Sequence, residues 1–126
     1  VVHNADKRTF PQVCQELSRL ISLARQKSLT RADVENGTFT ISNFGSFGST
    51  VGTPIINQPQ VAILGMGAVM KAPVVKDSQV VIRDQLHLSF SFDHRIIDGE
   101  LGGRFLYAIQ TSVEALTEET LGVKGL

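Results

Sequence analysis

Several features that would assign this chain of 126 residues to a special class are missing from it. Twelve basic and twelve acidic residues cancel, and without a surplus of cations we expect no binding to nucleic acid. The single cysteine, Cys14, cannot form an internal disulfide, so a reducing compartment is expected. No apolar run reaches the length of a membrane span, so no membrane partner is expected.

The N-terminus has no initiating methionine and no basic region followed by an apolar stretch. We therefore expect that it is not a signal peptide, and that the chain starts inside a larger gene product or has been processed. Hydrophobic residues make up 42% of the chain and charged residues 19%. This composition is typical of a globular protein, and the length fits one domain or part of one.

Two segments have the periodicity of helices. Residues 9–27 begin with Thr9 and Gln12 at the spacing of a capping box, and Pro11 is tolerated in a first turn. Their apolar residues recur every three to four positions, as they also do in residues 98–116. The two stripes comprise Val13, Leu17, Leu20, Ile21 and Ala24 in the first segment and Leu101, Phe105, Leu106, Ile109, Val113 and Leu116 in the second.

Four segments have the composition of strands: residues 38–41, 61–64, 79–83 and 86–92. Residues 84–85 are expected to form a tight hairpin turn between the last two, residues 31–37 a loop, and residues 42–52 a loop rich in glycine and serine. The order of elements predicts an α+β fold with a sheet and helices segregated to one of its faces.

The most informative position is His94, which follows the last predicted strand and precedes the second predicted helix. Histidine titrates near neutrality and both takes and returns protons, and the end of a strand is a rigid support for a catalytic side chain. Asp98 lies four residues later, where it could cap the helix or orient the loop. From the residues alone, a structural histidine followed by a simple cap is the commoner interpretation, and a catalytic histidine is the alternative.

Other candidate sites are weaker. Gly45, Gly48 and Gly52 match the spacing of neither a dinucleotide-binding nor a Walker loop. His87 lies seven residues before His94, which fits no common zinc motif. Neither a nucleotide cradle nor a metal site is therefore expected.

Three segments carry a resemblance to a known family. Residues 93–99 read Asp-His-Arg-Ile-Ile-Asp-Gly, which resembles the signature of the dihydrolipoamide acyltransferase (E2) components of 2-oxo acid dehydrogenase complexes and, more loosely, that of chloramphenicol acetyltransferases. Residues 38–45 and 53–65 resemble two further segments of the same family, in the same order. The resemblance covers essentially the whole chain, and residues 1–126 are similar to the C-terminal portion of the E2 catalytic domain.

The resemblance implies a chloramphenicol acetyltransferase-like sandwich, of which this chain would form the C-terminal half, and roles for three residues. His94 would be the general base that deprotonates the thiol of coenzyme A or of dihydrolipoyl-lysine. Ser42 would donate a hydrogen bond to the tetrahedral oxyanion, although a serine before a glycine-rich loop is commonly only a turn residue. Asp98 would fix the loop through a salt bridge or hydrogen bonds. Coenzyme A would be a substrate, with no binding residue assigned, and the lipoyl group would be carried by a separate domain.

The resemblance also implies partners. The chain would assemble as a homotrimer or a larger E2 core, with Ser42 and His94 meeting from different subunits. The E1 and E3 components would bind through domains outside residues 1–126, as the lipoyl domain would lie outside them. The compartment would be prokaryotic cytoplasm or the mitochondrial matrix, and the acyl group acetyl, succinyl or branched-chain. Two alternatives remain: a catalytically incompetent assembly fragment of E2, and a stand-alone acetyltransferase of the chloramphenicol type.

Overall fold

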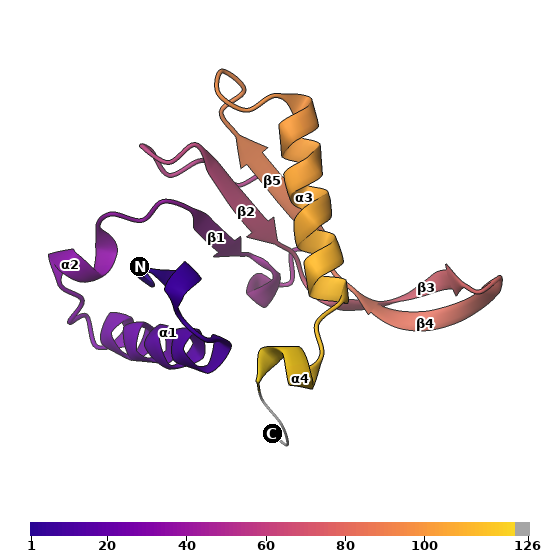
Figure 1. Ribbon diagram of the computed structural model, residues 1–126, viewed down its shortest axis with the longest axis horizontal. Coiled ribbons are helices and arrows are strands. Elements are labelled where there is room, and N and C mark those ends of the chain that lie inside the picture. The colour runs from indigo at the N-terminus through magenta and orange to yellow at the C-terminus, as the bar shows by residue number, and fades with distance from the viewer. Residues whose placement is uncertain (123–126) are drawn as a thin grey trace. The chain divides into compact units, whose positions relative to one another are not determined.

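The computed structural model describes residues 1–122 and divides the chain into two units. One unit comprises Val1–Thr38 together with the chain from Tyr107 onward, and the other comprises Phe39–Leu106. Both helices and strands are present, so the predicted α+β class is confirmed (Figure 1). None of the helices among residues 1–122 combines the length and the apolar character needed to cross a membrane.

A three-stranded mixed sheet forms the centre of the second unit. Strand β2 (Ala62–Met66) lies in the middle, parallel to β1 (Thr40–Asn43) and antiparallel to β5 (Leu88–Phe92). The predicted strands 38–41, 61–64 and 86–92 are thus present, with boundaries shifted by one or two residues. Ala62, Ile63 and Leu64 of the central strand are buried, because a strand on each side and packing on both faces cover them.

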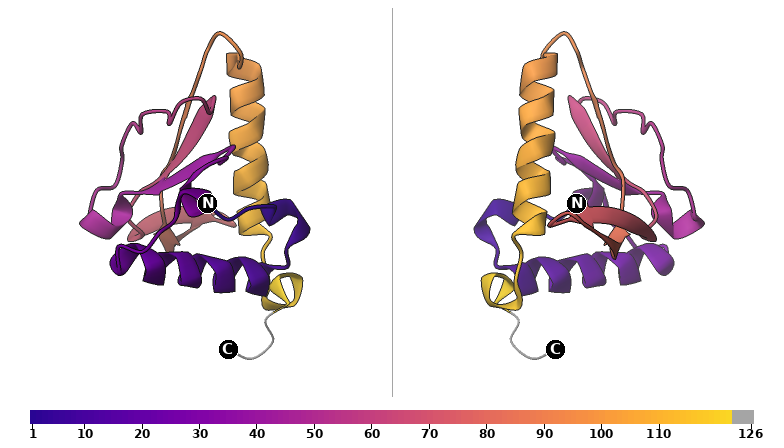
Figure 2. Two further views of the ribbon diagram at one scale, coloured as in Figure 1. Left: turned by 90° about the vertical axis from the view of Figure 1, so that its left-hand side faces the viewer. Right: turned by 90° about the vertical axis from the view of Figure 1, so that its right-hand side faces the viewer.

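One face of this sheet packs against helix α3 (Gly99–Glu114) (Figure 2). The rings of Phe39, Phe90 and Phe105 form an aromatic cluster, with ring centroids 5.0–6.5 Å apart. Gly102 allows the helix to approach closely, because a Cβ there would lie 2.7 Å from the ring of Phe92. The predicted helix at 98–116 and the shared face of Phe90 and Phe92 are confirmed.

Backbone packing fixes the loop that follows β1. This loop contains a 3-10 turn, η2 (Gly45–Phe47), and it contacts the chain that leaves β2. A Cβ on Gly45 would lie 2.3 Å from the carbonyl oxygen of Gly67, and a Cβ on Gly67 would lie 2.0 Å from that of Thr50. Both positions therefore require glycine, and the loop is held firmly next to the end of β1.

Strands β3 (Met70–Lys76) and β4 (Gln79–Gln85) form a separate two-stranded hairpin (Figure 1). The predicted turn at residues 84–85 is wrong, because these residues pair with β3, whereas β5 pairs with β2. The turn lies at Asp77 and Ser78, both with positive φ, as in the two-residue turns that match the twist of a hairpin.

In the first unit, α1 (Phe10–Arg25) confirms the helix predicted at 9–27 and its capping box: the Thr9 N–H donates to Gln12 Oε1 at 2.9 Å. The expected loop at 31–37 contains a short helix, α2 (Arg31–Val34), because Asp33 accepts hydrogen bonds from both the N–H and the hydroxyl of Thr30. Two further short elements, η1 (Ala5–Lys7) and α4 (Glu118–Leu121), were not predicted.

Candidate active site

His94 lies in an exposed turn that begins directly after β5. The sheet hydrogen bonding continues one residue beyond the strand, since the Asp93 N–H donates to the Val61 carbonyl at 2.8 Å. The imidazole ring lies 5.6 Å from the ring of Phe92, centroid to centroid, at an interplanar angle of 41°. This position leaves the ring exposed, while the residue before it stays hydrogen-bonded to the sheet.

The two sequence neighbours of His94, Asp93 and Arg95, form an ion pair. The guanidinium of Arg95 donates from Nη2 to Asp93 Oδ2 at 2.6 Å and from Nε to Oδ1 at 2.9 Å. These hydrogen bonds from Arg95 lower the pKa of the Asp93 carboxyl to about 2, and the carboxylate raises the pKa of Arg95. Sequence reasoning assigned no role to this pair, although an acid and a base two residues apart around a histidine were visible.

Asp98 caps helix α3. Its Oδ1 accepts a hydrogen bond from the Leu101 N–H at 2.8 Å, and its carbonyl accepts one from the Gly102 N–H at 3.0 Å. Among residues 1–122 its carboxylate forms no salt bridge, so the hydrogen-bonded cap is the contact by which it fixes the end of the histidine loop.

Ser42 is half-buried in β1 and lies in one row of the sheet with Gly65 and Ser89. The following residue, Asn43, accepts a hydrogen bond from the Ser46 N–H through Oδ1 at 3.2 Å, which holds the turn after the strand. Together with the glycine contacts described above, this arrangement gives Ser42 a fixed position next to a rigid loop.

The structure does not bring Ser42 and His94 together. Strand β5 runs from Ser89, in the row of Ser42, to Phe92, which is paired with Ala62 at the opposite end of β2. Three residues of strand span about 10 Å, and two steps across the sheet add about 10 Å sideways. A base and an oxyanion donor must each lie about 3 Å from the reacting group. One copy of this chain therefore cannot place both residues at the same reaction centre.

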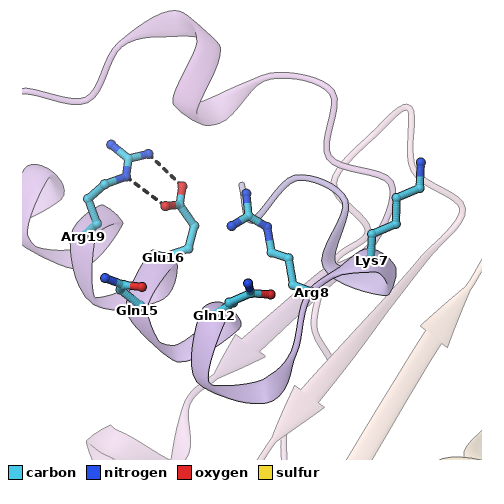
Figure 3. Close-up of a pocket in the computed structure, with 6 residues that line it drawn as sticks. All are labelled: Lys7, Arg8, Gln12, Gln15, Glu16 and Arg19. Carbon is cyan, nitrogen blue, oxygen red and sulfur yellow. Dashed lines mark hydrogen bonds and ion pairs between the residues drawn. The ribbon is translucent and has the colours of Figure 1, made fainter.

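A hollow of about 590 Å³ lies elsewhere, on the exposed side of α1 and η1 (Figure 3). It is lined by Lys7, Arg8, Gln12, Gln15, Glu16 and Arg19. Arg19 is paired with Glu16 at 2.8 Å, and Arg8 donates to the His3 carbonyl, so two of its three cations are already engaged. The described part of the chain also contains no group of three or more histidine, cysteine or acidic residues that could hold a metal ion.

A family model described as the catalytic domain of the 2-oxoacid dehydrogenases acyltransferase matches residues 1–121. The chain belongs to this family. The resemblance of residues 38–45, 53–65 and 93–99 is thereby confirmed as a family relationship.

Two relatives illustrate the range of acyl groups in the family. The chain is 43% identical over 114 residues to a dihydrolipoyllysine-residue succinyltransferase component of the 2-oxoglutarate dehydrogenase complex from Bartonella vinsonii, covering 90% of this chain and 28% of that protein. It is 40% identical over 121 residues to the lipoamide acyltransferase component of the branched-chain alpha-keto acid dehydrogenase complex of Bacillus subtilis, covering 95% and 28%. The chain thus spans about a quarter of the length of these relatives.

Solved structures show the same fold. A probable dihydrolipoamide acetyltransferase from Listeria monocytogenes superimposes with a TM-score of 0.88 at 45% identity, over 92% of this chain and 50% of that chain. The cubic core of the pyruvate dehydrogenase multienzyme complex gives a TM-score of 0.84 at 35% identity, over 94% and 48%. A dihydrolipoamide acetyltransferase from Azotobacter vinelandii, studied for a serine, a histidine and an asparagine in its catalytic mechanism, gives 0.85 at 34% identity, over 94% and 48%.

Proposed function

We propose that this chain forms the C-terminal portion of an acyltransferase catalytic domain in a 2-oxo acid dehydrogenase complex, and that it transfers an acyl group between dihydrolipoyl-lysine and coenzyme A. His94 is the general base, Ser42 donates a hydrogen bond to the oxyanion, and Asp98 holds the histidine loop by capping α3. Family membership supports the reaction class, and the positions of the three residues support their roles.

The spacing of the residues is the observation that carries the assignment. The numbers of Ser42 and His94 differ by 52, and those of His94 and Asp98 differ by four. In the Azotobacter enzyme, the serine and the histidine named for its mechanism are also 52 residues apart, and the asparagine follows the histidine by four. The third position is an aspartate here, and both residue types are good helix N-caps.

The acidity of the attacking thiol explains why the reaction needs a general base. A free thiol has a pKa near 8.5, so at neutral pH a neighbouring imidazole that accepts its proton increases the nucleophilic thiolate. The sulfur attacks the acyl thioester, and the hydroxyl of Ser42 stabilises the charge on the tetrahedral oxygen. Collapse of the tetrahedral intermediate breaks the original C–S bond and expels the other sulfur as a thiolate, which takes the proton from His94. Direct transfer between two sulfurs requires no acyl-enzyme intermediate.

The distance between Ser42 and His94 supports assembly as a homotrimer or larger core, because a second copy must supply the missing member of each site. The β3–β4 hairpin provides surface for such contacts. Register places Pro73, Val75, Val80 and Ile82 on one of its faces, and the last three are 76%, 74% and 74% exposed. An isolated two-stranded hairpin is marginally stable in water, and an exposed apolar face of this kind marks an interface.

The relatives support a choice of substrates to test and two compartments. Acetyl, succinyl and branched-chain transferases all match at similar identity, so all three acyl groups belong in the substrate test. The relatives come from bacteria and, in the case of the Bos taurus succinyltransferase, from mitochondria. We infer that the protein works in prokaryotic cytoplasm or the mitochondrial matrix, next to E1 and E3 components bound through other domains.

The experiment measures acyl transfer from acetyl-, succinyl- and isobutyryl-CoA to dihydrolipoamide. It uses the full-length natural protein that contains these residues. His94→Ala is the test variant and His87→Ala the matched control, because His87 is also an exposed histidine and lies outside the proposed site. We expect turnover that falls by about 10²–10⁴-fold in His94→Ala and is unchanged in His87→Ala. Turnover that survives in His94→Ala contradicts the proposal.

Two other outcomes favour the alternatives. Absence of turnover with all three donors, from a protein that assembles normally, favours a catalytically incompetent assembly fragment. Turnover of chloramphenicol without turnover of dihydrolipoamide favours a stand-alone acetyltransferase of the chloramphenicol type.

A further inference from the structure

The hydrogen bonds between the Asp93 carboxylate and Arg95 close a small ring that includes the backbone of His94. Besides the three hydrogen bonds from the guanidinium, the Oδ1 of Asp93 accepts a hydrogen bond from the backbone N–H of Arg95 at 3.0 Å. Both oxygens of Asp93 are therefore engaged by the residue immediately after His94. The backbone on the two sides of the histidine is joined through a side chain, which restricts the conformations that the histidine backbone can adopt.

Asp93 is itself held by the sheet and by the turn. Its N–H donates to the Val61 carbonyl at 2.8 Å, and its own carbonyl accepts from the N–H groups of Ile96 at 3.0 Å and Ile97 at 2.9 Å. Asp93 is thus hydrogen-bonded both to the sheet and to the turn that contains His94, and it holds the turn in a fixed position relative to the sheet.

The imidazole has little support of its own. Within residues 1–122, the imidazole nitrogens form no hydrogen bond, and the ring lies 5.6 Å from the tilted ring of Phe92. A general base must be placed within hydrogen-bond reach of the proton it removes. The direction of this ring therefore depends on the backbone to which it is attached.

We propose that the ion pair between Asp93 and Arg95 is a positioning device that sets the direction of the His94 ring for thiol deprotonation; this role rests on the proposed acyltransferase function. The pair is bidentate, and its partners are only two residues apart. Arg95 is 85% exposed and Asp93 20% exposed, and such surface pairs contribute little to global stability. Their effect is on local geometry.

The carboxylate keeps its charge under working conditions. Because the hydrogen bonds from Arg95 hold the pKa of Asp93 at about 2, the carboxylate is ionised throughout the neutral range in which a histidine base acts. The pair is therefore intact whenever His94 is needed.

A competing role for Arg95 is direct binding of an anionic part of the substrate, because guanidinium groups recognise phosphate and carboxylate. The two roles predict different kinetics. Loss of positioning lowers kcat and leaves KM for acyl-CoA unchanged, whereas loss of a substrate contact raises KM.

The kinetic experiment compares Arg95→Gln, Arg95→Lys, Asp93→Asn and the double variant Asp93→Asn/Arg95→Gln in the longest natural chain. We expect each single neutral substitution to lower kcat by about 10–100-fold with KM unchanged. The double variant is no slower than the single variants, since either change already breaks the pair. Arg95→Lys recovers part of kcat, because an ammonium keeps the charge but not the bidentate fork. A raised KM with kcat unchanged, or additive losses in the double variant, overturns the proposal.

A second readout does not depend on turnover. The ring protons of His94 experience the ring current of Phe92, and those of His87 serve as an internal reference in the NMR spectrum of histidine-labelled protein. We expect Arg95→Gln to move the His94 signals toward those of free histidine and to leave the His87 signals unchanged. Unchanged His94 signals overturn the positioning role. Displaced His94 signals, in a protein whose wild type has no acyltransferase activity, show that the pair sets the direction of the ring and contradict the proposed function.

Discussion

Ser42 and His94 lie at opposite ends of the same three-stranded sheet. Ser42 belongs to the row of Gly65 and Ser89, and His94 follows the row of Ala62 and Phe92. Each is held by an independent set of contacts: tight glycine packing for the loop after Ser42, and the Asp93–Arg95 pair for the turn of His94. In the proposed mechanism these two positions are half-sites, which a symmetric assembly of identical chains can combine.

Loss of the Ser42 hydroxyl tests the oxyanion role. We expect Ser42→Ala to lower kcat by about 10²–10³-fold with little change in KM, because the hydroxyl acts on charge that develops only in the transition state. Ser49→Ala is the control, since the backbone carbonyl of Ser49, and not its side chain, bonds to Ala68. Steady-state kinetics on both variants measure the effect, and a loss confined to KM would contradict the assignment.

Two variants of Asp98 distinguish the effect of its negative charge from the effect of its capping hydrogen bond. Asp98→Ala removes the acceptor for the Leu101 N–H and is expected to lower the free energy of unfolding by roughly 1 kcal/mol and to reduce kcat. Asp98→Asn keeps an acceptor at the same place and is expected to preserve both. Urea unfolding and initial rates check this pair of variants. Strong inactivation of Asp98→Asn would show that the negative charge itself acts in catalysis.

The Thr50 carbonyl lies so close to Gly67 that even an alanine side chain there is expected to lower the free energy of unfolding substantially. The Cβ of Gly67→Ala would lie 2.0 Å from the Thr50 carbonyl oxygen, so the backbone must shift, and we expect at least about 2 kcal/mol of destabilisation. Gly103→Ala is the matched control, because a Cβ on that exposed helical residue meets no atom within 4 Å. It is expected to stabilise the protein by roughly 0.5–1 kcal/mol. Thermal unfolding of both variants measures the difference, and equal melting temperatures would refute the packing argument.

The hairpin face predicts a change in assembly. A charge in Val80→Lys or Ile82→Lys would be buried at the proposed interface, and we expect dissociation of the oligomer without unfolding of the three-stranded sheet. Gln79→Lys places the same charge on the opposite face of the hairpin and is expected to leave the assembly intact. Analytical ultracentrifugation reports the outcome. An unchanged mass for both test variants would mean that this face lies outside the interface.

The histidine loop was predictable from the sequence because its residues are contiguous and lie between a clear strand and a clear helix. Of the β3–β4 hairpin, the strand predicted at 79–83 is present as β4, but β3 and the turn were not predictable, for two physical reasons. Its turn is formed by Asp77 and Ser78 without the glycine that usually marks such turns. In addition, Pro73, which lacks a backbone N–H, lies within β3. The ion pair of Asp93 and Arg95 was not predictable, because neighbouring opposite charges in a sequence do not reveal whether they form a contact.

The most direct test of a site shared between copies is complementation. Ser42→Ala and His94→Ala chains are purified separately, and then the two are co-assembled from an equal mixture and assayed for acyl transfer. If the half-sites belong to different copies, random mixing around a closed ring gives about a quarter of the sites both native residues, and activity rises to about a quarter of the wild-type value. Activity no higher than the mean of the two separate variants would contradict the shared site, and with it the account of how Ser42 and His94 act together.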